Sequence, residues 1–216
     1  MEFNPESRER TALLVVDMQN GFCHREGTVG QSNLDVEINE PIIPRIVDLV
    51  RATHQAGMPV MWSRQEHTTF DASRPRHRVK THLAKLDYIP CLRGTWDAEL
   101  LDELNSLVTH EDLVFAKHRA SCFYNTNLEL ELRMRGIDTL MITGVSSNYC
   151  VDASIRDAYA RDLDLYIIED ACACPWPELH EATMKTAAIF HGEVVSTTKA
   201  LAALESITRE EAPATA

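Results

Sequence analysis

The stretch TLMITGVSSNYCVDASIRDAYARDLDLYII, residues 139–168, decides the fold class of this chain. It opens on a short apolar run at 139–142, continues through polar residues into a helical pattern at 148–161, and closes on a second apolar run at 165–168. Short continuous apolar runs are typical of strands buried on both faces of a parallel sheet. A strand, a helix and a strand in this order predict a right-handed crossover between two parallel strands.

The same alternation extends in both directions along the chain. Further strands are predicted at 13–16, 59–62, 113–115 and 193–195, and helices at 41–56, 96–107, 127–135 and 178–190. We therefore expect one three-layer αβα domain over residues 1–216. Its doubly wound, mostly parallel, Rossmann-like sheet of about six strands would carry helices on both faces.

Two segments depart from this alternation. Residues 65–95 lack clear periodicity and hold many charges, so we predict a long excursion that serves as a lid or as an interface arm. The tail from about residue 209 is polar with Ala and Pro, which predicts a disordered end.

The composition of the chain argues against some classes of binding partner. With 216 residues, 44% hydrophobic and 25% charged, the chain has an ordinary globular composition. Its formal net charge is -12, and this negative charge repels the phosphate backbone of DNA and RNA. We therefore predict no nucleic-acid partner. The apolar runs are too short for a membrane span, and the charged start lacks the apolar core of a secretory signal. We therefore expect a cytoplasmic location, no membrane partner, and six reduced cysteines rather than disulfides.

Three reactive residues follow three of the predicted strands. Asp17 directly follows the strand at 13–16, Lys117 follows the strand at 113–115 by one residue, and Cys150 lies near the start of the helix at 148–161. Ligands bind beyond the carboxyl ends of parallel strands, so we expect these residues to meet. A helix start and an ammonium would favour the Cys150 thiolate, while Asp17 would accept and return a proton. The backbone N–H of Cys150, with another in the preceding turn, would receive an oxyanion.

Each member of the trio also has a purely structural interpretation. An Asp at a strand end often caps a helix or forms a turn, and a Lys after a strand is usually solvated. A lone Cys at a helix start is more often packed in the core. Their joint placement is what favours catalysis.

At these residues the chain resembles the isochorismatase-like cysteine hydrolase superfamily. The similarity covers nearly all of residues 10–205 and is carried by TALLVVDMQNGFC (11–23), FAKHRASCFYNTNLELELRMRGIDTLMITGVSSNYCVDASIRDAYA (115–160) and IIEDACAC (167–174). Segments 93–105 and 117–127 look most similar to the ureidoacrylate and carbamoyl amidohydrolases.

The resemblance implies an isochorismatase-like fold and a catalytic triad of Asp17, Lys117 and Cys150. It also implies a cis peptide bond between Val145 and Ser146, with the N–H groups of Ser146 and Cys150 as the oxyanion hole. The implied activity is a cysteine-dependent amidohydrolase that cleaves a C–N bond of a small amide, ureido or carbamoyl substrate through a thioester-type intermediate. The implied assembly is a homo-oligomer, a dimer or a tetramer. A vinyl ether hydrolase of the isochorismatase type and a catalytically silent binding protein on the same fold are the alternatives.

One departure from the family concerns metal binding. Nicotinamidases share an Asp-x-His metal motif after the second strand, where this chain reads SRQEH at 63–67. Gln65 stands in place of the metal-binding Asp, and only His67 of the pair remains. A neutral amide is a poor substitute for a carboxylate ligand, so we predict no metal and no other cofactor.

Several residues near the trio are candidates for contact with the substrate, namely Gln19, Phe22, Gln65, Arg119, Phe123 and Tyr149. Arg119 would pair with a substrate carboxylate or carbonyl, and Phe123 would form an apolar wall. Packing of the loop is an equal alternative for both. Cys172 and Cys174 are expected to pack after the fifth strand, although Cys172 would lie near the substrate entrance by the resemblance.

Overall fold

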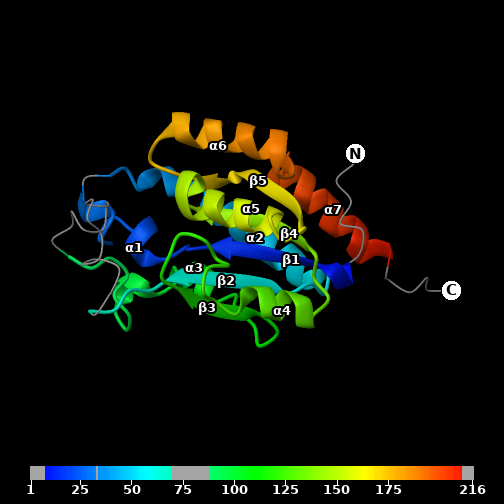
Figure 1. Ribbon diagram of the computed structural model, residues 1–216, viewed down its shortest axis with the longest axis horizontal. Coiled ribbons are helices and arrows are strands. Elements are labelled where there is room, and N and C mark those ends of the chain that lie inside the picture. Colours follow the sequence, from blue (N-terminus) through cyan, green and yellow to red (C-terminus); the bar gives the residue numbers. More distant parts are fainter. Residues whose placement is uncertain (1–7, 33, 70–87, 211–216) are drawn as a thin grey trace.

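The computed structural model describes residues 8–32, 34–69 and 88–210 (Figure 1). Six strands in this part of the chain form one sheet: β1 (Thr11–Val16), β2 (Val60–Gln65), β3 (Leu113–Lys117), β4 (Thr139–Val145), β5 (Asp164–Ala173) and β6 (Glu193–Val195). Their order is β3-β2-β1-β4-β5-β6, and every neighbouring pair is parallel. This confirms the predicted parallel α/β sheet.

Helices cover both faces of the sheet, as the three-layer prediction requires (Figure 1). One face packs against α2 (Ile42–Gln55) and α7 (Thr197–Glu210), and the other against α4 (Leu128–Met134), α5 (Asp152–Tyr159) and α6 (Pro177–Phe190). Shorter helices lie in the connections: η1 (Arg8–Arg10), α1 (Asn20–Cys23), η2 (Gly30–Ser32), η3 (Glu37–Asn39), η5 (Trp96–Ala98), α3 (Asp102–Asn105) and the π-helical turn η6 (Ser147–Val151).

The continuous apolar run of β1 supplies both halves of the core. Leu13 and Val15 pack with α2 and α7, whereas Leu14 and Val16 pack with α4, α5 and α6. Successive side chains of a strand point to opposite faces, so a strand covered on both faces has no position for a polar side chain. This is why the run reads apolar without alternation.

Strand order reverses between β1 and β4, and the two strands approach closely at their carboxyl ends. A Cβ atom on Gly144 would lie 2.2 Å from the carbonyl oxygen of Val16, and Gly144 has a φ of 115°. Only glycine fits this backbone conformation and this contact. In open parallel sheets the reversal point is where ligands bind, and Asp17 and Ser146 follow β1 and β4 directly at this place.

Three local expectations differ from the structure. The single helix predicted at 96–107 is wrong, because the chain between η5 and α3 is extended and bonds to the segment after β1: Asn20 N–H donates to Glu99 O at 2.9 Å, and Leu101 N–H to Met18 O at 3.0 Å. Strand β5 runs to Ala173, so Cys172 lies inside the strand rather than after it. Helix α7 is not among the predicted elements. It extends to Glu210, past the predicted start of the tail at residue 209.

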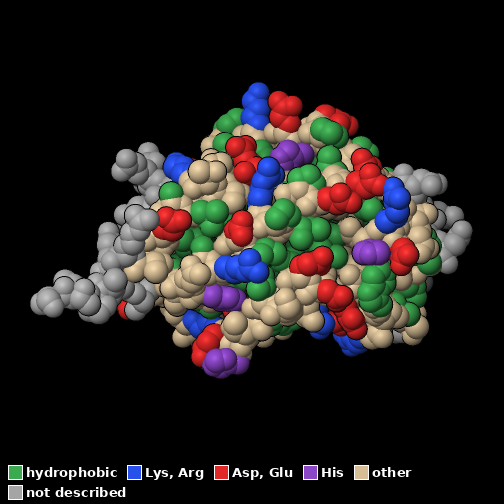
Figure 2. All heavy atoms as spheres, turned by 180° about the vertical axis from the view of Figure 1, so that it is seen from behind, with side chains coloured by type: hydrophobic (Ala, Val, Ile, Leu, Met, Phe, Trp, Pro, Cys, Tyr) green, Lys and Arg blue, Asp and Glu red, His purple; other side chains and the backbone are tan. Residues whose placement is uncertain are grey.

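Two predicted features lie mostly outside the described residues: the centre of the 65–95 excursion and the tail from 211. The face seen in Figure 2 carries acidic and basic side chains interspersed with apolar ones. Among the described helices, none has the length and apolar character needed to cross a bilayer. All six cysteines belong to the described part of the chain, and each is buried and unpaired.

Candidate active site

Asp17 is the first residue after β1 and lies in a sharp turn. Its φ of 51° is in the left-handed region, which a non-glycine residue adopts at a cost of about 1–3 kcal/mol and mostly at functional sites. Its backbone N–H donates to both the carbonyl oxygen (3.3 Å) and Oγ (3.2 Å) of Ser63 on β2. The turn leaves the Asp17 side chain wholly buried.

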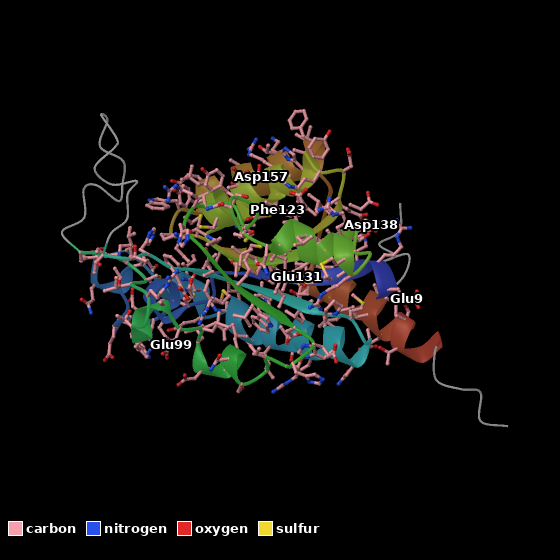
Figure 3. All side chains as sticks on the ribbon, turned by 60° about the horizontal axis from the view of Figure 1, so that its bottom comes forward. Glu9, Glu99, Phe123, Glu131, Asp138 and Asp157 are labelled. Carbon is pink, nitrogen blue, oxygen red and sulfur yellow. The ribbon has the colours of Figure 1, made fainter. Side chains whose placement is uncertain are left out.

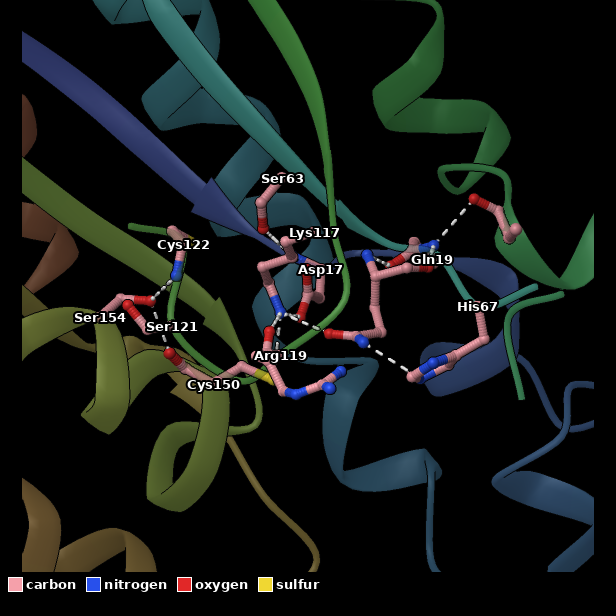
Figure 4. A network of polar contacts seen from close by, with 12 residues as sticks. Asp17, Gln19, Ser63, His67, Lys117, Arg119, Ser121, Cys122, Cys150 and Ser154 are labelled. Carbon is pink, nitrogen blue, oxygen red and sulfur yellow. Dashed lines mark hydrogen bonds and ion pairs between the residues drawn. The ribbon is translucent and has the colours of Figure 1, made fainter. Parts of the chain in front are cut away.

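Lys117 ends β3 and carries a buried ammonium surrounded by acceptors (Figure 4). Its Nζ lies 2.6 Å from Asp17 Oδ2, 2.8 Å from Gln65 Oε1, 3.1 Å from Arg119 O and 3.4 Å from Cys150 Sγ. Burial of a charge is costly unless the charge is paired and hydrogen-bonded, and this ammonium is both. One cation therefore joins the carboxylate to the thiol.

Cys150 lies in η6, only 6% exposed, four residues after a cis peptide bond between Val145 and Ser146. The carbonyl oxygen of Ser146 accepts from the N–H groups of Tyr149 and Val151 at 3.0 and 3.1 Å. Ser154 fixes the far side of the turn: its Oγ donates to Cys150 O at 2.7 Å and accepts from Cys122 N at 3.0 Å. The thiol is thus held beside Lys117 by a turn bonded at both ends.

Burial decides the protonation of the thiol. Burial raises the pKa of Cys150 well above its ordinary value, and Asp17 raises it further through its charge and a hydrogen bond, whereas Lys117 lowers it. The predicted influence of Lys117 is in the expected direction, but burial opposes it and is the larger of the two. Burial is the largest single influence on Lys117 and lowers its pKa, but the charges of Asp17, Cys150 and Cys122 and the hydrogen bond to Asp17 together outweigh it, so the net pKa is raised. The raised pKa values favour the cationic form of Lys117 and the protonated form of the Cys150 thiol, so attack by sulfur calls for a nearby base.

Strand β2 supplies the remaining contacts to this pair. Ser63 Oγ donates to Asp17 Oδ1 at 2.7 Å. Gln65 uses both ends of its side-chain amide: Oε1 accepts from Lys117, and Nε2 donates to His67 Nε2 at 3.0 Å. Gln19 fixes Gln65 in turn, because its Oε1 accepts from Gln65 N at 2.7 Å and its Nε2 donates to Gln65 O at 3.0 Å.

A family model described as Isochorismatase domain matches residues 11–199. The chain belongs to the isochorismatase domain family. The ureidoacrylate amidohydrolase RutB of Acinetobacter baylyi is 34% identical over 201 residues, which cover 88% of this chain and 81% of that protein. A cysteine hydrolase from Pseudomonas syringae has a TM-score of 0.81 at 27% identity, covering 93% and 95% of the two chains. An N-carbamoylsarcosine amidase from Thermoplasma acidophilum has a TM-score of 0.68 at 25% identity, covering 87% and 96%.

In this isochorismatase-family chain, some of the site residues predicted from the sequence lie in the buried cluster around Lys117, and others lie around it. Asp17, Lys117, Cys150 and Gln65 meet in the buried cluster described above. Gln19 is wholly buried, and its amide is used by Gln65 and by Ala98 O at 2.8 Å, so the structure gives it a positioning contact within the chain.

The aromatic candidates lie farther out. Phe123 is buried beside helix α5, with the Arg161 guanidinium 5.0 Å from its ring centre (Figure 3). Phe22 is half-buried against the core on the α2 face. Tyr149 is 48% exposed; burial raises the pKa of its phenol, the thiol of Cys150 adds to this, and Lys117 and Arg119 lower it. Tyr149 is therefore within electrostatic reach of the cluster.

Arg119 lies at the same cluster with its backbone and side chain in different roles. Its carbonyl oxygen accepts from Lys117, while its Nη1 donates to His118 O at 2.7 Å (Figure 4). Its side chain is partly buried, and no carboxylate of the described residues pairs with its guanidinium. This leaves guanidinium N–H groups for a ligand.

Sequence reasoning missed Ser63 and Ser154. The sequence carries a weak signal for Ser63, because it is the first polar residue after the apolar run at 60–62, in a strand whose neighbouring positions are buried. Ser154 lies within a helical pattern, where a serine at one-turn spacing from Cys150 carries no distinguishing mark.

Proposed function

We propose that the chain hydrolyses a small ureido or carbamoyl compound by covalent catalysis through Cys150. Similarity to ureidoacrylate amidohydrolases over most of both chains makes it a hydrolase of non-peptide C–N bonds. The observation that carries the mechanism is the Lys117 ammonium, 2.6 Å from Asp17 Oδ2 and 3.4 Å from Cys150 Sγ. It assembles a nucleophile, a proton acceptor and a stabilising cation in one buried cluster.

The first half-reaction forms a thioester-type intermediate. Asp17 accepts the thiol proton as Cys150 Sγ bonds to the substrate carbonyl carbon, and Lys117 stabilises the sulfur while it is anionic. The N–H groups of Ser146 and Cys150 bind the oxyanion. The C–N bond then breaks, and the proton on Asp17 passes to the departing nitrogen, which leaves as ammonia or an amine.

Water completes the cycle. It transfers a proton to Asp17 as its oxygen bonds to the acyl carbon, and the C–S bond breaks. The sulfur recovers the proton from Asp17, which restores the resting thiol. Asp17 thus acts twice as base and twice as acid, which requires it to return to the same position at each step.

The first test is ammonia release from a panel of ureidoacrylate, biuret, N-carbamoylsarcosine, maleamate and nicotinamide. We expect release from a ureido or carbamoyl member of the panel. We also expect the rate to be unchanged by prolonged incubation with a chelator, because the Gln65 amide is already bonded to Lys117 and His67. Loss of turnover with chelator and its return with added Zn²⁺ or Mn²⁺ would contradict the absence of a catalytic metal.

The substrate is further proposed to carry a carboxylate that binds Arg119. Ureidoacrylate, the compound in the relative's name, joins a ureido group to a carboxylate. A guanidinium binds a carboxylate through two parallel hydrogen bonds, and Arg119 is a cation at the cluster without a described carboxylate partner. A neutral substrate would lack this contact.

Replacement of Arg119 by alanine tests this contact. We expect KM for ureidoacrylate to rise about 10- to 100-fold, since a hydrogen bond to a charged group contributes about 1.5–3 kcal/mol. KM for the uncharged methyl ester should stay within about threefold. Arg51→Ala, at an exposed arginine of α2, is the control with the same change in net charge. Equal losses on the acid and the ester would assign Arg119 to loop packing instead.

The predicted homo-oligomer and cytoplasmic location rest on the resemblance and the composition. Light scattering coupled to size-exclusion chromatography at micromolar protein concentration tests the first.

A further inference from the structure

Ser63 is the first polar residue after the apolar run of β2, and its side chain has no access to solvent. It is the fourth residue of β2, is wholly buried, and pairs in register with Val16 on one side and Phe115 on the other. A buried hydroxyl without a partner costs about 1–3 kcal/mol in proteins. Its presence here therefore depends on what it contacts.

Its contact is the carboxylate of Asp17. Ser63 Oγ donates to Asp17 Oδ1 at 2.7 Å and accepts from Asp17 N at 3.2 Å, while the Ser63 carbonyl oxygen accepts from the same N–H at 3.3 Å. One residue thus bonds both the backbone and the side chain of Asp17, at a turn whose φ of 51° is unfavourable for a non-glycine residue. These bonds stabilise the turn at Asp17 and fix the orientation of its carboxylate group.

The two carboxylate oxygens of Asp17 consequently have different surroundings. Oδ1 faces the Ser63 hydroxyl, and Oδ2 lies 2.6 Å from Lys117 Nζ, the atom that also lies 3.4 Å from Cys150 Sγ. A proton that moves between the sulfur and the substrate nitrogen must use an oxygen on the Lys117 side. A half turn of the carboxylate only exchanges two equivalent oxygens, but any intermediate rotation would move the acceptor oxygen away from Lys117 and the thiol.

We propose that Ser63 is a positioning residue that keeps Asp17 Oδ1 engaged and so directs Oδ2 to every proton transfer of the reaction. The inference rests on the proposed covalent function. Ser63 contacts Asp17 and not the substrate, so it acts on the chemical steps rather than on binding. The hydroxyl stays bonded to Oδ1 whether Oδ2 is ionised or protonated, because a neutral carboxyl group still has an acceptor oxygen at that position.

Asp17 is surrounded by one cation and several thiols. Lys117 from β3 supplies the positive charge, and the thiols of Cys150, Cys122, Cys23 and Cys91 approach from η6, from the segment before α4, from α1 and from the segment before η5. A hydroxyl that donates to a carboxylate favours its charged form, so removal of the Ser63 hydroxyl should move the acidic limb of the pH profile to higher pH.

Ser63→Ala is expected to lower kcat about 10- to 100-fold on the ureido or carbamoyl substrate, with KM changed less than about threefold. The acidic limb of kcat/KM should move to higher pH. Ser63→Thr keeps the hydroxyl in a strand that favours β-branched residues, and should recover kcat to within about threefold of the wild type. Each protein is first compared by thermal unfolding, so that turnover is measured on folded enzyme.

Thr53→Ala is the matched control, because Thr53 is also wholly buried and donates to Leu49 O at 2.7 Å within α2. It should lower the melting temperature and leave kcat and the pH profile unchanged. The inference is overturned if Ser63→Ala keeps wild-type kcat and pH profile, if it raises only KM, or if folded Ser63→Thr is as impaired as Ser63→Ala. Asp17→Asn separates the two proposals: an active Asp17→Asn enzyme refutes the covalent mechanism, whereas an inactive one beside a fully active Ser63→Ala refutes only the role of Ser63.

Discussion

Replacement of Cys150 by alanine is expected to lower kcat/KM for the ureido or carbamoyl substrate by about 10⁴-fold or more, as with other covalent nucleophiles. Without sulfur no thioester forms, and the buried Asp17–Lys117 pair has no group to deprotonate. The fold should persist, because the side chain that is removed is small and its turn is held by Ser146 and Ser154. Turnover is measured as ammonia release, and folding by circular dichroism.

Two further measurements test whether the loss of turnover is specific to the thiol of Cys150. Cys174→Ala removes another buried thiol, one that bonds to Trp176 O at 3.0 Å, and should keep activity within about threefold of wild type. Acid quenching of wild-type enzyme during turnover should yield a protein heavier by the acyl group, with the added mass on the peptide that contains Cys150. A Cys150→Ala enzyme with wild-type ammonia release would contradict the covalent mechanism, whereas a wild type and a variant that both cleave a vinyl ether and release no ammonia would favour the isochorismatase-type reaction.

The meeting of Asp17, Lys117 and Cys150 could be predicted from the sequence for a simple reason. The carboxyl ends of parallel strands lie at one edge of the sheet, so residues that follow three such strands must be near one another. Asp17 and Lys117 come from strands on either side of β2, and Cys150 comes from the turn after β4. Continuous apolar runs marked those strands, and the order of strands and helices gave the crossovers.

What the sequence did not reveal depends on contacts between distant segments. The helix expected at 96–107 is interrupted because residues 99–101 bond to the chain after β1, and no local periodicity encodes that pairing. The sequence predicted a favoured thiolate at Cys150 from its helix start and from Lys117, but it gave no measure of burial, which raises the pKa of the thiol by more than Lys117 lowers it. Ser63 acquires its role only when β2 lies beside β1, which places its hydroxyl on the Asp17 carboxylate.

Lys117→Met is expected to destabilise the fold by about 3–5 kcal/mol, because it leaves the Asp17 carboxylate buried without its counter-charge. Asp17→Asn should also destabilise, since it leaves the ammonium buried with neutral acceptors. The double variant Asp17→Asn/Lys117→Met removes both charges, and should be more stable than the sum of the two single changes predicts, by about 0.5–3 kcal/mol. All three proteins should lack turnover.

Urea unfolding of the four proteins measures this coupling, with Lys199→Met as the control. Lys199 pairs with Glu193 at 2.7 Å on the surface, with side chains 47% and 31% exposed, so its loss should cost less than about 1 kcal/mol. The raised pKa of Lys117 sets the pH range: the stabilisation is complete below 10.5, the ordinary lysine value, and is lost only as the pH rises through the higher folded value. Strictly additive single variants, or a Lys117→Met protein as stable as the wild type, would mean that the pair does not stabilise the fold. Suppose that the pair is coupled in this way and that turnover is lost when either residue is replaced. The positive charge of Lys117 then has two effects, because it stabilises the anionic sulfur of Cys150 and also compensates the buried carboxylate of Asp17. The proposed catalytic cluster would therefore also stabilise the sheet.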